Sequence, residues 1–369
     1  MFAKITKKNT DGIITNVICN SAKQGLIPQR EYFDKDIANS DNTSGYYIIE
    51  ENDFVYNPRK SSDAPYGPIS SYKYSDAGIV SPLYLCFRAK GAINPSFYEW
   101  YFRSSAWHRY VYMSGDSGAR HDRVSIKDDV FFAMPISIPS VREQEHIASF
   151  LDMIDQRIDK QRTLVDNLKK YKRGLLSYVF EEMSISDDAD STAYPFSEIA
   201  QRRREKYNPD SGVEYPCIEL EYIEPGTGRL LGSVSSTTQS SIKTVARSGD
   251  VLFGKLRPYL RKFAFADQDI VCSSEIWAFV PSEYVIPKYL YYLVQTEHFL
   301  RVANISSGTK MPRAEWANIG KEPFDIPSIP NQEKVVSILE AVDKKICVSG
   351  DSLRMLSNFR KGLLQQLFI

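Results

Sequence analysis

Two stretches of the chain share a hydrophobic spacing in which the seam residues recur at alternating intervals of four and three. The seam residues include Ile147, Leu151, Ile154, Ile158, Gln161 and Leu168 in the first stretch, and Val335, Leu339, Val342, Ile346, Ser349 and Leu356 in the second. Polar Lys172 and Arg360 fall on later positions of the same seam. This heptad spacing predicts a helix of about 60 Å in each stretch, at ~1.5 Å per residue. Gln161 and Ser349 are polar interruptions at the same seam position.

The two stretches belong to a longer internal repeat. Residues 138–180 and 326–368 align without a gap, and 14 of the 43 aligned positions are identical. Solenoid repeats have periods of about 20–50 residues, so a repeat with an offset of 188 residues is of another kind. We interpret it as the duplication of a globular domain together with a long helix.

The segments before each helix show matching patterns. Short runs rich in β-formers alternate with Gly, Pro, Asn and Asp, which predicts strands and turns. A proline then opens a predicted helix, over residues 95–113 in the first half and 286–303 in the second. Residues 130–139 read as a last strand before the first long helix.

These patterns predict an α+β protein with two globular α/β domains separated by two long antiparallel coiled-coil helices, with pseudo-two-fold symmetry. The predicted segments are domain 1 (1–137), helix 1 (138–183), a Ser- and Asp-rich linker (184–195), domain 2 (196–325) and helix 2 (326–369). Antiparallel packing would bring Gln161 and Ser349 together and fix the register. The alternative is that each helix packs only on its own domain.

Composition narrows the class of protein. The 46 basic and 46 acidic residues balance, which argues against a diffuse polycation but allows local basic surfaces. The five cysteines are scattered without a C-x-x-C pair, as in a reduced cytoplasmic protein. The N-terminus lacks the apolar core of a signal peptide, and no transmembrane run is present. We therefore expect a soluble, intracellular protein.

Motifs for catalysis are missing from the sequence. GTGRLLG (226–232) lacks the Lys-Ser/Thr end of a phosphate loop, and there is no G-x-S-x-G nucleophile elbow. The four histidines are far apart and none forms an i, i+4 metal pair. We expect no catalytic residue and no metal site, which favours a binding or scaffold protein.

Basic and aromatic residues instead recur in loops at matching places of the two halves. The candidate DNA-binding residues of the first half are Asn57, Arg59, Lys60, Tyr66, Ser70, Ser71, Lys73, Tyr74, Arg120, His121 and Arg123. Those of the second half are Lys255, Arg257, Tyr259, Arg261, Lys262, Thr309, Lys310 and Arg313. Arg and Lys neutralise phosphates, and polar side chains read base edges. Any one of these residues could equally lie in a solvated turn, as could the basic run QRRREK (201–206).

The doubled I-P-S-x-x-x-Q-E followed by a long helix ending in K/R-K/R-G-L-L resembles the specificity subunit of type I DNA restriction–modification systems. The segments ENDFVYNPRK and GDVLFGKLRPYLRK resemble the target recognition domains of that family. The resemblance implies two recognition domains held apart by antiparallel helices, with no catalysis. Met1 starts where the matching segment of domain 2 is already under way, so domain 1 is either complete as it stands or finished by residues near the C-terminus.

The resemblance also implies partners. Each domain would read one half of a bipartite site in double-stranded DNA, and the helices would bind two methyltransferase subunits and set the spacer. Those subunits use S-adenosylmethionine, and restriction (motor-nuclease) subunits use ATP and Mg, so this chain binds no cofactor itself. The setting would be the cytoplasm of a prokaryote, in antiviral defence through DNA methylation. A structural adaptor that clusters partner proteins, and a specificity module of a self-contained restriction enzyme, remain as alternatives.

Overall fold

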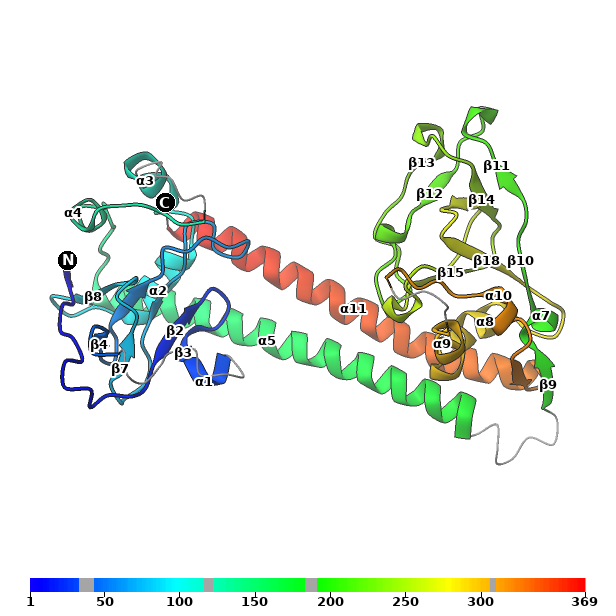
Figure 1. The fold of residues 1–369 in the computed structure, drawn as a ribbon, viewed down its shortest axis with the longest axis horizontal. Helices are drawn as coiled ribbons and strands as arrows, with labels where there is room; N and C mark the ends of the chain where they lie inside the picture. The colour runs from blue at the N-terminus through cyan, green and yellow to red at the C-terminus, as the bar shows by residue number, and fades with distance from the viewer. Residues whose placement is uncertain (33–42, 116–121, 183–190, 306–309, 369) are drawn as a thin grey trace. The chain divides into compact units, whose positions relative to one another are not determined.

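The computed structural model describes residues 1–32, 43–115, 122–182, 191–305 and 310–368. The chain forms two compact units: unit 1 comprises residues 1–161 and 352–369, and unit 2 comprises residues 162–351. The two long helices are α5 (Val141–Ser177) and α11 (Ile329–Leu367). The boundary between the units falls inside both helices, so each helix contributes one part to each unit (Figure 1).

Unit 1 contains a four-stranded sheet in the order β1-β8-β5-β6 and two strand pairs, β2-β3 and β4-β7. The strands are β1 (Phe2–Lys4), β2 (Ile18–Ser21), β3 (Gly25–Pro28), β4 (Tyr47–Ile49), β5 (Phe54–Tyr56), β6 (Ile69–Ser71), β7 (Gly78–Val80) and β8 (Leu85–Ala89). The short helices are α1 (Gln29–Tyr32), α2 (Pro95–Arg103), α3 (His108–Ser114) and α4 (Asp128–Phe132).

Unit 2 contains sheets in the orders β10-β18-β15-β16, β11-β14-β17-β12-β13 and β19-β9. The strands are β9 (Thr192–Pro195), β10 (Ala200–Arg202), β11 (Lys206–Tyr207), β12 (Pro216–Ile218), β13 (Val234–Ser235), β14 (Lys243–Ala246), β15 (Val251–Gly254), β16 (Phe263–Phe265), β17 (Ile270–Cys272), β18 (Ile276–Pro281) and β19 (Pro323–Ile326). The helices are α7 (Phe196–Ile199), α8 (Pro287–Leu293), α9 (Glu297–Ala303) and α10 (Trp316–Ile319). A π-helical turn, η2 (Tyr178–Glu182), follows α5, and the 3-10 turns are η3 (Pro209–Ser211), η4 (Leu220–Tyr222), η5 (Ser236–Thr238) and η6 (Pro258–Leu260).

The first sheet of each unit has the same topology, as the repeat predicts. In unit 1, Phe54 of β5 faces Phe87 of β8, and their rings stack with centroids 5.4 Å apart. In unit 2, Val251 of β15 faces Phe279 of β18 in the same register. All four side chains are fully buried. The duplication therefore includes the apolar core beneath each sheet.

An aspartate precedes both β5 and β15, and each of the two forms a buried ion pair. Asp53 is fully buried, and its carboxylate accepts hydrogen bonds of 2.6 and 2.7 Å from Arg88. Asp250 accepts bonds of 2.5 and 2.8 Å from Arg203 in the same way. These bonds raise the pKa of both arginines. A buried carboxylate requires such a partner, so each aspartate fixes the start of its strand.

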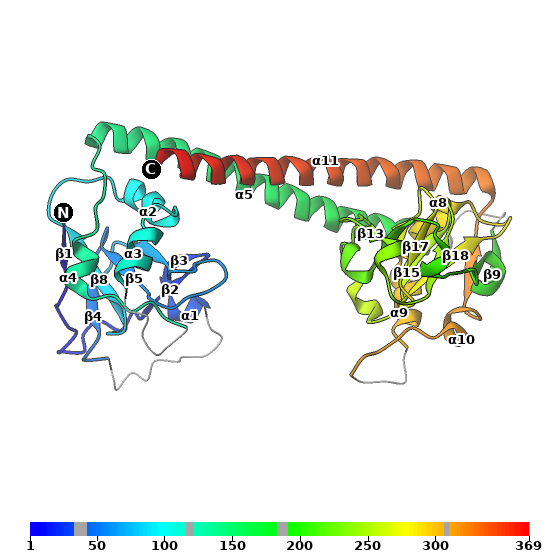
Figure 2. The same ribbon diagram turned by 90° about the horizontal axis from the view of Figure 1, so that it is seen from above.

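The doubled Gln-Glu motif ties each long helix to its domain. Gln144 is 1% exposed, and its amide accepts from the backbone N–H of Asn94 and donates to the carbonyl of Pro139. Gln332 is fully buried and accepts from the backbone N–H of Ile286. In both cases the glutamine accepts a hydrogen bond from the backbone N–H of the residue just before a helix that begins with proline, α2 in unit 1 and α8 in unit 2. Figure 2 shows α2 and α8 lying between the strands of their unit and the long helices.

The long helices pair in antiparallel fashion within each unit, as predicted. In unit 1, Arg360 of α11 pairs with Asp155 of α5. In unit 2, Lys172 of α5 pairs with Asp343 of α11, with Nζ and Oδ1 2.6 Å apart. The residue numbers of the two pairs have the same sum, as antiparallel helices in one register require. Lys172 and Arg360 are matching positions of the repeat, and so are Asp155 and Asp343.

The predicted seam residues lie in the interior of these helix pairs. Leu151, Ile158 and Leu339 are fully buried, and Ser349 is 8% exposed. The other seam residues are half-buried: Ile147, Ile154, Gln161, Leu168, Val335, Val342, Ile346 and Leu356. The predicted contact between Gln161 and Ser349 stays a prediction, because the two residues belong to different units.

The end of α11 packs into unit 1. Phe368 is 7% exposed, and its ring centroid lies 5.4 Å from that of Phe97 and 5.9 Å from that of Tyr101. Leu363 and Leu364 pack against the same core. The second repeat's helix thus completes the core of the first unit. The alternative in which each helix packs only on its own domain is therefore wrong.

Three predicted elements differ from the structure. The predicted helix over residues 286–303 divides into α8 and α9, because Thr296 has an extended conformation and caps the start of α9. The sequence predicts a strand over residues 130–139, but Asp128–Phe132 form helix α4 and no regular element follows before α5. Two aspartates in the first turn favour a helix start over a strand. The predicted helix 95–113 divides into α2 and α3, because Ser104 adopts an extended conformation and caps α2.

Two further regions bear on the sequence predictions. Residues 192–195, the end of the predicted linker, form β9 and pair with β19. No helix among the described residues is long and apolar enough to span a membrane.

Candidate nucleic-acid interface

In unit 1, the structure brings two of the predicted basic loops together. The loop after β5 pairs with the segment before α4 through a bridge between Arg59 and Arg123. The N–H of Lys60 donates to the carbonyl of Asp122 at 2.9 Å, and the N–H of Val124 donates to that of Pro58 at 2.9 Å. Arg59 and Lys60 are exposed there, and neither has a side-chain partner within the described part of the chain.

Unit 2 forms the same pair of loops with different residues. The N–H of Arg257 donates to the carbonyl of Pro312 at 2.8 Å, and the N–H of Ala314 donates to that of Lys255 at 2.8 Å. Leu256 and Arg313 form the bridge between them. We call these two arrangements loop ladder 1 (residues 58–60 with 122–124) and loop ladder 2 (residues 255–257 with 312–314).

Two arginines in the loop after β15 have unusual backbone geometry. Arg257 and Arg261 both have left-handed conformations, with φ of 51° and 52°. They flank the turn η6, in which Tyr259 is 54% exposed. A non-glycine residue in this region carries a backbone cost, which is accepted mainly where the fold or a site requires it. The turn therefore presents Arg257 and Tyr259 outward from a defined backbone.

The cations of unit 2 differ in whether their charge is already paired. Arg261 forms an ion pair with Glu297 at 2.8 Å, and Arg313 forms one with Glu275 at 3.0 Å. The hydrogen bond to Glu275 raises the pKa of Arg313. Lys262 donates from Nζ to the carbonyl of Leu220 at 2.5 Å, so its ammonium group is engaged within the domain.

Three of the predicted cations of unit 2 are available by contrast. Lys255, Arg257 and Lys310 have no side-chain partner among the residues that the structure describes. Arg257 and Lys310 are exposed, and Lys255 is half-buried. Together with Arg59 and Lys60 of unit 1, they are the predicted residues best placed to meet a phosphate.

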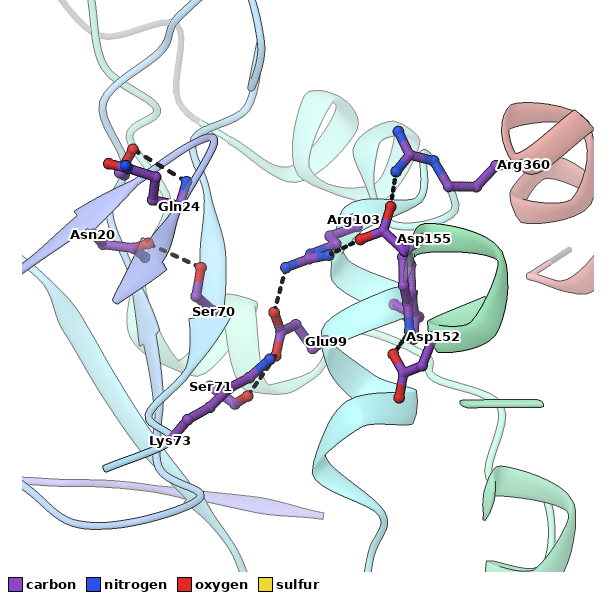
Figure 3. A network of polar contacts seen from close by, with 12 residues as sticks. Asn20, Gln24, Ser70, Ser71, Lys73, Glu99, Arg103, Asp152, Asp155 and Arg360 are labelled. Carbon is purple, nitrogen blue, oxygen red and sulfur yellow. Dashed lines mark hydrogen bonds and ion pairs between the residues drawn. The ribbon is translucent and has the colours of Figure 1, made fainter. Parts of the chain in front are cut away.

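Several predicted DNA-binding residues of unit 1 lie inside the domain, which corrects their assignment. Ser70 and Ser71 are 6% and 4% exposed. Ser70 donates to the side chain of Asn20 at 2.9 Å, and Ser71 donates to Glu99 at 2.6 Å (Figure 3). Both point inward because β6 is buried on both faces. The apolar–polar pattern of the strand could not show this.

Asn57 and Tyr66 also make contacts within unit 1, around the loop after β5. The side chain of Asn57 donates to the carbonyl of Asn20 at 3.3 Å and accepts from the N–H of Arg59 at 3.1 Å. Tyr66 is half-buried, with its ring centroid 4.6 Å from that of His108. Burial lowers the pKa of His108. These residues shape loop ladder 1 rather than face a ligand.

Glu99 is a buried carboxylate that sequence patterns did not single out. It is 4% exposed on α2 and accepts from Arg103 at 2.6 Å as well as from Ser71. Lys73 lies 3.1 Å from it with 65% of its own side chain exposed, so the charge of Lys73 is partly paired (Figure 3). Tyr74 is 37% exposed next to Lys73. Arg103 lies four residues after Glu99 on α2, but Ser71 and Lys73 come from a distant segment, so no sequence spacing connects them with Glu99.

Arg120, His121 and Thr309 lie outside the described residues, so their DNA-binding role stays a prediction. Arg123 is half-buried, and its Nε has no hydrogen-bond partner among the residues that the structure describes, although the carboxylate of Asp122 lies 3.9 Å away. Among the described residues, no group of three or more His, Cys, Asp or Glu side chains could hold a metal ion.

Comparison with known proteins gives the family. The sequence model described as "Type I restriction modification DNA specificity domain" matches residues 4–170 and again residues 189–350. The chain belongs to this family. The two matched copies follow the internal repeat, and each contains one loop ladder and the start of one long helix.

Relatives agree with this family. The chain is 26% identical over 135 residues to the type I restriction enzyme HindI specificity subunit of Haemophilus influenzae, covering 34% of this chain and 29% of the relative. It is 21% identical over 276 residues to the EcoDI specificity subunit of Escherichia coli, covering 63% of this chain and 61% of the relative. The chain thus aligns with less than two thirds of the length of these curated relatives.

A solved structure shows the same fold. It concerns complex assembly and conformational transition of the type I R-M system, and one of its chains matches with a TM-score of 0.62. The match covers 99% of this chain and 94% of that chain, at 16% sequence identity. The fold has therefore been kept while most of the sequence has changed.

Proposed function

We propose that this chain is the DNA-recognition subunit of a type I restriction–modification complex, in which each unit reads one half of a bipartite target. The observation that carries the proposal is the loop ladder, which occurs once in each unit with the same backbone bonds. The backbone is repeated, but the side chains on it differ. Two such sites with different side chains suit the reading of two different half-sites.

Charge supports the same function. Although the chain has no net charge, three exposed cations of the loop ladders, Arg59, Lys60 and Arg257, lack carboxylate partners within the described residues. Unpaired Lys and Arg side chains bind phosphates and position a protein on the duplex. Arg side chains near the same backbone can then read base edges in the major groove.

The long helices offer a surface for partner proteins. Exposed apolar residues recur one position before the seam, at Phe150, Leu164 and Tyr171 of α5, at Tyr178 of η2, and at Ile338 and Phe359 of α11. Phe150 matches Ile338 in the repeat, and Tyr171 matches Phe359. We propose that these matching apolar residues bind two copies of the methyltransferase subunit, one for each repeat.

The chemistry would belong to the partners. Methyltransferase subunits would transfer the methyl group of S-adenosylmethionine, and restriction subunits would use ATP and Mg. This chain would supply the sequence specificity and bind none of these cofactors. The sequence, which lacks the phosphate-loop and nucleophile motifs, supports this division of labour.

Selection on random DNA tests the proposal. The full chain, alone and with its methyltransferase subunits, is incubated with a random duplex library, and the bound DNA is sequenced. We expect enrichment of two short fixed motifs separated by a spacer of constant length. Enrichment of no motif in either preparation would favour the structural adaptor instead.

The Arg257→Ala variant is expected to weaken binding to all DNA sequences alike and to reduce the slope of log affinity against log salt by about one. Arg257 is exposed, and its charge is unpaired within the described residues. The measurement is a titration of labelled duplex over several salt concentrations. A slope equal to that of the wild type would refute a phosphate contact.

Lys262→Ala is the matched control from the same loop. Because Lys262 bonds to the carbonyl of Leu220, its loss is expected to cost about 1 kcal/mol of stability and to leave the salt slope unchanged. Thermal unfolding and the same titration separate the two effects.

A further inference from the structure

Arg202, at the end of β10, lies on the faces of two tryptophans. Its guanidinium carbon is 4.8 Å from the ring centroid of Trp316 and 5.5 Å from that of Trp277. The two indoles meet edge to face with centroids 6.2 Å apart, and both are half-buried. Arg202 itself is exposed, and no carboxylate pairs with it within the described residues. The two indole rings thus restrain the guanidinium group of Arg202, while its N–H groups remain available to donate hydrogen bonds to a ligand.

This cluster adjoins loop ladder 2. Trp316 follows Ala314 by two residues, and the N–H of Ala314 bonds to Lys255. Trp277 follows Glu275 by two residues, and the carbonyl of Glu275 accepts from the N–H of Lys255 at 2.9 Å. Both tryptophans are therefore two residues from a backbone partner of the ladder. Arg202 joins the unpaired cations of unit 2 at this end of the sheet.

The residue of unit 1 that matches Arg202 is Lys4, and its charge is paired. Lys4 faces Phe87 in β8, just as Arg202 faces Phe279 in β18. Lys4 forms an ion pair at 2.5 Å with Asp128, the first residue of α4. The first residue of α10, at the same place in the repeat, is Trp316. Unit 2 therefore has an aromatic face in place of the neutralising carboxylate, and its cation has no carboxylate partner among the described residues.

We propose that Arg202 is a further DNA contact of unit 2 and donates two parallel hydrogen bonds from its stacked guanidinium to a pair of acceptors on the duplex. This assignment rests on the DNA-recognition function proposed above. Two acceptor pairs have the required geometry: O6 and N7 of a guanine, and two oxygens of one phosphate. The aromatic faces keep the N–H groups aligned, which lowers the ordering cost of binding.

The test uses the full chain with its methyltransferase subunits and the duplex that the wild type selects. Arg202→Met keeps an apolar stem on the indoles and removes the donors, so folding should be retained; thermal unfolding checks this. We expect roughly tenfold weaker binding. A guanine contact would also relax the base preference at one position of one half-site. A phosphate contact would weaken all sequences alike and lower the salt slope by about one.

Arg202→Lys separates the planar fork from charge alone. It keeps the cation but cannot form two parallel bonds, so we expect it to recover only a minor part of the lost affinity. Lys4→Ala is the matched control in unit 1 and should bind like the wild type, because its charge is already paired. Wild-type affinity in Arg202→Met or in Arg202→Lys, or an equal loss in Lys4→Ala, would overturn the assignment. Failure of the wild type to select any motif would instead overturn the proposed function.

Discussion

The Asp343→Ala variant is expected to lower the free energy of unfolding of unit 2 by about 3–5 kcal/mol, because it leaves a buried ammonium group without its counter-charge. The Lys172 side chain is 5% exposed and lies 2.6 Å from Asp343. Its Nζ also lies 5.3 Å from the ring centroid of Tyr292, whose hydroxyl donates to Asp343 at 2.9 Å. The variant therefore removes a charge partner and a hydrogen-bond acceptor together. Calorimetry on the full chain measures the loss.

The repeat supplies a matched control for this prediction. Asp155→Ala breaks the equivalent pair in unit 1, but Arg360 is 32% exposed and can turn to solvent. We expect a loss of about 1 kcal/mol or less there. A double variant, Lys172→Met with Asp343→Leu, should recover much of the stability that Asp343→Ala loses. Equal losses in Asp155→Ala and Asp343→Ala would contradict the role of burial.

Adding one heptad to both long helices is expected to abolish binding to the original target and to create a target whose spacer is longer by about three base pairs. Seven helical residues add about 10 Å, and DNA rises about 3.4 Å per base pair. The insertions belong after Gln161 and after Leu353, because the pairing of Asp155 with Arg360 puts these points at one level. Selection on random DNA reads out the spacer directly.

A heptad added to α5 alone is the control for the double insertion. It should disrupt the antiparallel pairing, since the matched residues of the two helices no longer face each other. The double insertion keeps both the seam and the pairing. An unchanged spacer in the double insertion would show that the helices do not set the distance between the half-sites.

The long helices could be predicted from the sequence because their pattern is local and repeated. Heptad spacing decides which face of a helix is buried, and a second copy confirms the phase. The polar seam residues Lys172 and Arg360 interrupt the apolar spacing, and the sequence does not indicate their partners. In the structure they form ion pairs with Asp343 and Asp155, respectively. Each partner lies far away in sequence, so only the antiparallel register explains both.

The candidate interface could be predicted only in part. The sequence indicates which loops match in the two halves, because basic residues recur there, but the direction of each side chain depends on tertiary packing. Ser70 and Ser71 lie on a strand buried on both faces, and they bond to Asn20 and Glu99. Arg202 was part of a basic run that indicated no more than a solvated face. Its two tryptophan neighbours come from distant segments that only the folded chain brings together.

The exchange of one recognition domain, read out by methylation mapping, tests the central claim most directly. Residues 196–325 are replaced by the matching segment of a relative with a different target, and the methylated sites are mapped in a host carrying the complete system. If each unit reads its own half-site, one half of the motif changes while the other half and the spacer stay the same. A change in both halves, or in neither, would contradict this account.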